Sequence, residues 1–200
     1  MENSLLLSDQ KNKKRIKMNI DHTSTRRVFE LLSRGQFLSA NAIKPDIRKL
    51  YDQVDEYFTA FESVYAPLGF HLKKGNNYYY FSREGGRQTI EEKIERFYRY
   101  IDRLSFFATF APGFGEGMRF YVKDIVHKCN VETDLNDQLQ RLSSDKSTST
   151  HDKVRDLVEE MRRQGFMDCE DDENEGFIVL SSYNYLKDIV DLIDIDPTNE

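Results

Sequence analysis

The sequence predicts a mainly helical α+β protein with two winged-helix domains in tandem, each carrying a short β-hairpin as its wing. Three observations support this fold class. Each half contains a long amphipathic helix, each helix ends at a Gly-Phe step (Leu68-Gly69-Phe70 and Gln164-Gly165-Phe166), and each step leads into a short hairpin followed by Ser and another helix. Helices followed by a two-stranded wing are the element order of a winged helix-turn-helix.

The composition is that of a globular chain. Hydrophobic residues make up 38% and charged residues 32% of the 200 residues, enough core material for one large domain or two small ones. No stretch approaches the roughly 18 to 20 consecutive apolar residues of a membrane helix, and the amino terminus lacks a signal-peptide pattern. The isolated Cys129 and Cys169 fit a reducing compartment. We therefore expect a cytoplasmic protein without a membrane segment.

The two halves differ in charge. Residues 1–100 carry 18 Lys and Arg against 13 Asp and Glu, whereas residues 101–200 carry 11 against 22, for net charges of +5 and −11. The asymmetry indicates that the halves face different partners, or that one half meets the opposite half of a second copy. Two solvated surfaces of unequal charge explain the same counts, and both interpretations stay open.

Helical spacing of apolar residues locates the first elements. Residues 1–22 form a polar, basic arm that is too poor in apolar residues to join a core. A helix is predicted from Thr23 to Ser33, with Thr23, Ser24 and Thr25 as candidate caps. The strand-like run QFLSA precedes a second helix, which starts at Pro45 and continues to Tyr65.

After Gly69 the apolar period changes from helical to two, which predicts a hairpin. A first strand starts at Phe70, a Gly/Asn turn follows, and residues 78–81 form an aromatic return strand. A long helix is predicted over 89–110, and the Pro/Gly-rich segment 112–117 interrupts the chain after it.

The second half repeats this order. Its predicted elements are a short element over 120–128, helices over 133–142 and 151–164, a hairpin with the return strand 177–180, and a closing helix over 182–193. The predicted division is a flexible basic arm at 1–22, a winged-helix domain at 23–88, a connecting helix and linker at 89–117, a second winged-helix domain at 118–194 and an acidic tail at 195–200.

The first half resembles a known family over residues 29–84. The resembling features are Leu31-Leu32 before Gly35-Gln36-Phe37, the helix that ends in Leu68-Gly69-Phe70, and the strand that closes with Phe81-Ser82-Arg83-Glu84. They are similar to the first domain of the MukE/MksE group, the KITE subunits of bacterial condensins, which includes a subunit of Wadjet plasmid-defence systems. The second half resembles the same family in its order of helices and strands more than in its amino-acid sequence.

The resemblance implies a homodimer of tandem winged-helix protomers without catalytic activity. It also implies binding to a kleisin and, through the kleisin, to an SMC ATPase that acts on DNA. The parent complex would be associated with the nucleoid and would serve chromosome organisation and segregation or plasmid defence.

Basic residues of the first half are candidates for contact with DNA, because each cation that neutralises a phosphate releases a condensed counterion. The candidates are Lys73, Lys74, Arg83, Arg87, Arg26, Arg27, Lys44, Arg48 and Lys49. A solvated charged face explains the same pattern. The acidic turn of the second wing, residues 170–175, would repel phosphates, so a DNA-binding role for both wings is not expected.

Aromatic residues are the candidates for a protein interface. They are Tyr78, Tyr79, Tyr80, Phe81, Phe97, Tyr98, Tyr100, Phe106, Phe107 and Phe110. Successive strand residues point to opposite faces, so two of the four residues 78–81 belong to the core. The other two are left for a partner protein or for cover by the helix 89–110. That helix is apolar on more than one side and packs against a domain of this chain or against another subunit.

The sequence contains no recognisable catalytic, metal or cofactor pattern. The acidic run from Asp168 has Glu173 where an EF-hand loop needs Gly, and Val179 where it needs Glu. The segment GFGEG at 113–117 lacks the Lys-Ser/Thr of a phosphate-binding loop. We therefore expect neither an enzyme nor a cofactor, although an unrecognised enzyme is kept as a third hypothesis.

The alternative function is a stand-alone winged-helix transcription regulator, which places a recognition helix in the major groove of DNA. Base recognition needs a helix that exposes Arg, Lys, Asn or Gln. The helices that precede the two wings expose mainly Asp and Glu, so the sequence favours the kleisin-binding subunit.

Overall fold

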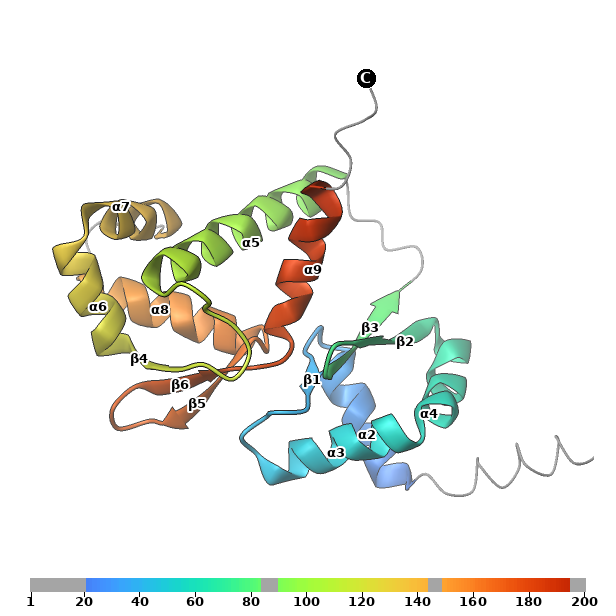
Figure 1. Cartoon of the computed structure of the whole chain (residues 1–200). Coiled ribbons are helices and arrows are strands. Elements are labelled where there is room, and N and C mark those ends of the chain that lie inside the picture. Colours follow the sequence, from blue (N-terminus) through green and yellow to red (C-terminus); the bar gives the residue numbers. More distant parts are fainter. Residues whose placement is uncertain (1–20, 84–89, 144–148, 195–200) are drawn as a thin grey trace, which may run out of the picture.

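The first half of the chain has the element order helix, strand, helix, helix, strand, strand (Figure 1). The computed structural model describes residues 21–83, 90–143 and 149–194. The elements of the first half are α2 (His22–Leu32), β1 (Leu38–Ser39), α3 (Pro45–Glu56), α4 (Phe58–Tyr65), the short 3-10 helix η1 (Ala66–Leu68), β2 (Phe70–Gly75) and β3 (Tyr78–Arg83). The predicted arm, apart from its last two residues, and the acidic tail lie outside the described residues.

The second half begins with the long helix α5 and ends with the shorter helix α9. Its elements are α5 (Ile90–Phe110), β4 (Arg119–Tyr121), α6 (Val122–Val131), α7 (Thr133–Leu142), α8 (Thr150–Arg163), β5 (Met167–Asp171), β6 (Gly176–Val179) and α9 (Tyr183–Asp194). The predicted short element over 120–128 is therefore the end of a strand followed by most of a helix.

Both halves contain the same small sheet. The strand order is β1-β3-β2 in the first half and β4-β6-β5 in the second, and all described pairs are antiparallel. In both, the strand that precedes the middle helices pairs with the return strand of the hairpin. Gly69 and Gly165, the matching glycines before the two hairpins, have φ angles of 76° and 83°, in the left-handed region that favours glycine. The prediction of a mainly helical α+β fold with short hairpin wings is confirmed.

The predicted single helix from Pro45 to Tyr65 is two helices. Tyr57 has φ −117° and ψ 32°, outside the helical region, and its carbonyl oxygen accepts the backbone N–H groups of Ala60 and Phe61 at the start of α4. The bend lets α3 contact β1 while α4 contacts β2. The start of α2 also differs from the prediction, because the side chain of Asp21 caps this helix by accepting the backbone N–H groups of Thr23 and Ser24.

Each half has its own hydrophobic core. The first core includes Leu50, Val54, Phe61, Tyr65, Leu72 and Tyr79. The second core includes Phe106 and Phe107 of α5 and Phe114 of the following loop. The segment 89–117, predicted to connect two domains, thus supplies core residues to the second half, and α5 is the first helix of that half as α2 is of the first. The predicted division into domains at 23–88 and 118–194 stays a prediction.

Candidate partner-binding groove

The return strand β3 has one face in the first core and the other against the second half. Tyr79 is fully buried in the first core. On the opposite face, the rings of Tyr78 and Tyr80 lie 5.8 and 5.9 Å from the ring of Phe37, and the ring of Tyr80 lies 5.1 Å from that of Tyr185 in α9. The two aromatic residues left over by the first core therefore contact α9 and Phe37.

Polar contacts join the two halves beside these rings. Asn41 donates from Nδ2 to the carbonyl oxygen of Val179 at 3.0 Å and accepts at Oδ1 from the backbone N–H of Ser181 at 2.8 Å. The backbone N–H of Ser182 donates to Oγ of Ser39 at 3.3 Å. The Asn41 side chain thus forms hydrogen bonds with two backbone groups at the end of β6.

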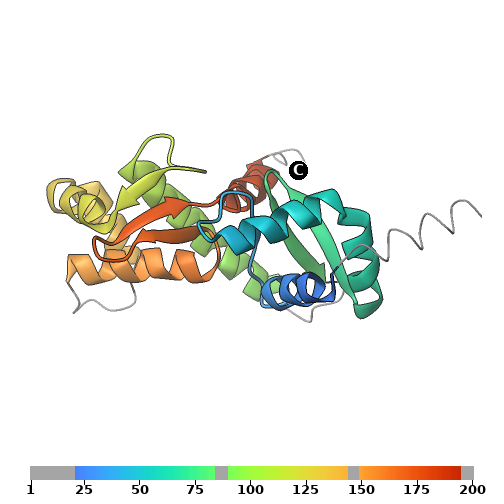
Figure 2. The ribbon, with the colours of Figure 1, turned by 90° about the horizontal axis from the view of Figure 1, so that it is seen from below.

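Tyr78 makes a further contact between the halves. Its hydroxyl donates to Oδ2 of Asp188 in α9 at 3.1 Å. Burial raises the pKa of Tyr78 above its usual value, and the charge of Asp188 raises it further. Figures 1 and 2 show α9 beside the sheet of the first half, with the two halves lying along an elongated molecule.

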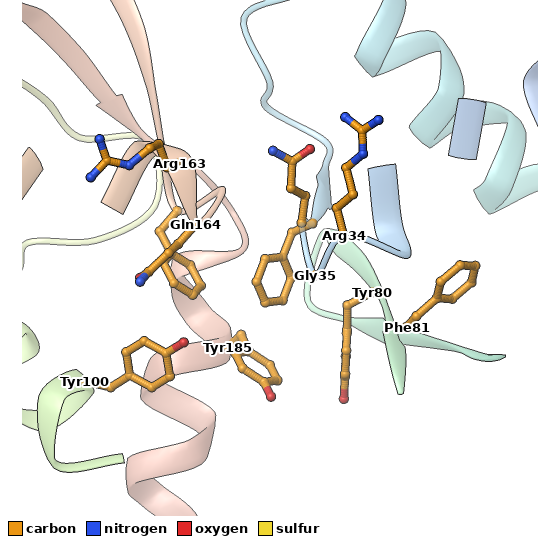
Figure 3. A pocket seen from close by; sticks show the side chains of 11 residues that line it. Arg34, Gly35, Tyr80, Phe81, Tyr100, Arg163, Gln164 and Tyr185 are labelled. Atoms are coloured by element: carbon orange, nitrogen blue, oxygen red, sulfur yellow. The ribbon is translucent and has the colours of Figure 1, made fainter. Parts of the chain in front are cut away.

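A cavity of about 310 Å³ opens where the halves meet. Figure 3 shows Tyr80 on one side of this cavity, Tyr100 and Tyr185 on the other, and Arg34 and Arg163 at the same end on opposite sides. Its lining consists of Arg34, Gly35, Gln36, Phe37, Tyr80, Phe81, Tyr100, Arg163, Gln164, Phe166 and Tyr185. The cavity is therefore aromatic in its interior and cationic at one end.

A second cavity, of about 170 Å³, continues along the same boundary and shares Gln36 and Phe37 with the first. Its lining consists of Leu31, Gln36, Phe37, Ser39, Ala42, Lys44, Ile47, Arg162, Gly165, Met167, Asp168 and Leu180. We call the two cavities together the seam groove.

The charge of the seam groove is predominantly positive. Arg34, Arg163 and Lys44 are exposed and have no side-chain partner within the described ranges. Arg162 pairs with Glu159 at 2.9 Å. The carboxylate of Asp168 accepts the backbone N–H of Ile43 at 3.3 Å, which ties β5 to the first half.

Most of the candidate DNA-contacting cations have partners on the protein. Arg26 pairs with Glu30 at 3.5 Å, and Arg27 forms an ion pair with Asp46. The Arg27 guanidinium lowers the pKa of the Asp46 carboxyl. Arg48 donates to two backbone carbonyl oxygens at 2.7 and 2.9 Å.

The candidates on the first wing divide into paired and unpaired residues. Lys74 pairs with Asp55 at 2.6 Å, and Arg83 lies 4.3 Å from the centre of the Phe70 ring. Lys73 is exposed, as are Lys44 and Lys49 of the α3 region, and none of the three has a side-chain partner in the described part of the chain. Arg87 lies outside the described residues. DNA contact by these residues stays a prediction.

The candidate interface residues of α5 separate into buried and exposed groups. Phe106 and Phe107 are fully buried, and Phe110 is partly buried against the same core. Tyr98 is 64% exposed, whereas Tyr100 is half-buried and lines the larger cavity. The side chain of Phe97 lies outside the described part. Only the exposed and half-buried members are therefore accessible to another protein.

The described residues that line the seam groove provide groups for binding. Across 21–83, 90–143 and 149–194, no group of three or more His, Cys, Asp or Glu side chains is placed to hold a metal ion. Over the same ranges, no helix has the length and apolar character to cross a membrane. What the seam groove can supply is aromatic contact, hydrogen-bonding amides and hydroxyls, and positive charge.

The comparison with known families covers both winged-helix units. The family model described as condensin complex protein MksE matches residues 23–190, from the start of α2 into α9. The chain belongs to the MksE family. The match confirms the resemblance seen in the first half and extends it over the second half. None of the curated proteins matches the chain in sequence.

Several residues of the seam groove were not among the predicted sites of this MksE-family chain. Arg34 and Phe37 lie between α2 and β1, Arg163 ends α8 and Tyr185 belongs to α9, and sequence spacing does not show that these three segments meet. The available signal was Gln36-Phe37, a polar-aromatic pair directly after the glycine that ends α2.

Proposed function

We propose that this MksE-family protein is a non-catalytic subunit that binds the kleisin of a condensin-type complex and reaches the SMC ATPase through that kleisin. The observation that carries the proposal is the family match over both winged-helix units. The seam groove supports it, because an aromatic cavity bordered by hydrogen-bonding and charged side chains suits a peptide of another protein.

The same proposal includes a homodimer. Exposed apolar side chains support self-association, since Leu68 is 61% exposed and Val64 37% exposed near the end of α4. The complex would act on DNA at the nucleoid in the cytoplasm, in chromosome organisation and segregation or in plasmid defence.

Co-purification tests this function. The chain is expressed alone and together with the kleisin of its own complex, and the products are measured by size-exclusion chromatography with light scattering. We expect twice the chain mass of 23.6 kDa for the protein alone and a joint peak with the kleisin. Separate elution of the chain and the kleisin would contradict the proposal.

Two further measurements separate the cellular roles and the alternative function. Deleting the gene should produce anucleate cells if the complex maintains the chromosome, and higher plasmid retention if it acts in defence. A transcription regulator would instead bind one duplex sequence without the kleisin. The helix before the first wing, α4, argues against this alternative because it contains no Lys or Arg.

A further inference from the structure

The seam groove has a charge pattern that selects among peptides. The described residues that line it include the four cations Arg34, Lys44, Arg162 and Arg163 and the single carboxylate of Asp168. Because Arg34 and Arg163 stand at one end of the larger cavity without side-chain partners in the described ranges, this end attracts negative charge.

The interior of the larger cavity suits one apolar side chain. Rings from Phe37, Tyr80, Tyr100, Phe166 and Tyr185 line it, and they come from both halves of the chain. A volume of about 310 Å³ is at the lower limit of small-molecule sites, which commonly span about 300 to 1,000 Å³. This size fits a single anchoring side chain better than a cofactor.

Two edge strands border the smaller cavity. β1 pairs with β3 and β5 pairs with β6, so each is an edge strand of its described sheet. Ser39 of β1 and Met167 and Asp168 of β5 line this cavity. Edge strands bind extended peptides through main-chain hydrogen bonds while neighbouring pockets take alternate side chains.

We infer that the seam groove binds an extended acidic segment of the kleisin, with one aromatic or large aliphatic side chain in the cavity and carboxylates at Arg34 and Arg163. The inference rests on the proposed function and names the chemistry of the partner at this site. A nucleic acid strand fits less well, because its continuous row of phosphates would also pass Asp168 in the smaller cavity, whereas the peptide's carboxylates lie only at Arg34 and Arg163 of the larger cavity.

Peptide binding tests the inference. The probes are fluorescein-labelled peptides of about 15 residues, some 50 Å when extended, tiled across the kleisin of the same complex. Fluorescence anisotropy measures their binding to the full chain. The tightest peptides should carry net negative charge and at least one Phe, Tyr, Leu or Ile, and their binding should weaken with added salt.

Charge reversal provides the matched comparison. The double variant Arg34→Glu with Arg163→Glu should bind the best peptide about tenfold more weakly or worse. The control is Lys123→Glu with Arg141→Glu, which makes the same change of charge at two exposed positions of the second half that line neither cavity. The control should bind within about twofold of the unchanged chain.

A blocking variant tests the groove without changing its charge. Gln36 lines both cavities and is half-buried, so Gln36→Trp should fill the groove and remove peptide binding. Circular dichroism and the melting temperature confirm that each variant is folded. Binding of the full kleisin should fall in parallel with that of the peptide.

The outcomes distinguish this inference from the proposed function. If the full kleisin binds the chain but charge reversal equals its control, or the tightest peptides are not acidic, the inference is wrong and the proposed function stands. If the kleisin does not bind the unchanged chain, both are wrong. If charge reversal weakens binding of a labelled single-stranded oligonucleotide and leaves peptide binding unchanged, the groove binds nucleic acid and the inference is wrong.

Discussion

A single carboxylate joins helix α3 to the first wing. Asp55 accepts hydrogen bonds from the Lys74 ammonium group at 2.6 Å and from the hydroxyl of the buried Tyr79. These donors lower the pKa of Asp55 below its usual 3.8, and burial together with the Asp55 contact raises the pKa of Tyr79 to about 12. Lys74 was a candidate for DNA contact, and its partner in the structure is this carboxylate.

The Asp55 contact predicts a pH-dependent loss of stability in Tyr79→Phe. Removing the hydroxyl should lower the free energy of unfolding by about 1 kcal/mol at pH 7, measured by urea denaturation. A carboxyl whose pKa is lowered on folding stabilises the fold above its unfolded pKa of 3.8, and the effect is lost as the pH falls through the lower folded value. The difference between the two proteins should therefore be constant above about pH 5 and shrink below pH 3.8.

Tyr98→Phe serves as the control for this residue-scale prediction. Tyr98 is 64% exposed, so the loss of its hydroxyl should leave the free energy of unfolding nearly unchanged. Equal effects of the two substitutions, or a Tyr79→Phe effect that grows in acid, would contradict the role given to the Asp55 contact.

At the scale of the element, α5 illustrates what sequence pattern can and cannot establish. Its helical period was evident, and so was its excess of aromatic residues. The surface against which those residues pack could not be predicted, because a helix that is apolar on more than one side can pack against several surfaces. The structure places Phe106 and Phe107 in the second core and leaves Tyr98 exposed.

The same limit applies to α3, α4 and β3. The apolar stripe from Leu50 to Tyr65 continues across the break at Tyr57 without Gly or Pro, so local pattern predicts one helix where tertiary contacts produce two. The alternation of β3 correctly predicted two inward and two outward aromatic residues. Its cover by α9, more than a hundred residues later in the chain, is a long-range contact that periodicity does not contain.

The assignment of α5 to the second core predicts a large effect of Phe107→Ala. Phe107 is fully buried, and its ring stacks on that of Phe114 with centroids 4.7 Å apart. Truncation should lower the free energy of unfolding by about 3 to 5 kcal/mol, since it leaves a cavity. Tyr98→Ala on the exposed side of the same helix should cost less than about 1 kcal/mol. Similar losses at both positions, measured by chemical denaturation, would contradict this packing of α5.

At the scale of the whole molecule, the contacts between the halves determine whether the two winged-helix units act as one body. Aromatic contacts through Phe37 and Tyr185 lie beside the hydrogen bonds of Asn41 and Tyr78. The seam groove exists only while these contacts hold, because both halves line each of its cavities. A chain with independent halves would lose the groove without losing either core.

Asn41→Ala should uncouple the two halves. The substitution leaves the N–H of Ser181 without its partner, at a cost of about 1 to 3 kcal/mol if it stays buried. It also removes one of the two hydrogen bonds to the carbonyl of Val179, which still accepts from the N–H of Gly117. We expect one calorimetric unfolding transition in the unchanged chain and two in the variant, with a larger radius of gyration by X-ray scattering. The control Asn130→Ala changes an exposed residue of α6 and should keep the single transition. A variant that unfolds like this control would contradict the role given to Asn41, since the aromatic contacts and the hydrogen bonds of Tyr78, Ser39 and Ile43 would then hold the halves together without it.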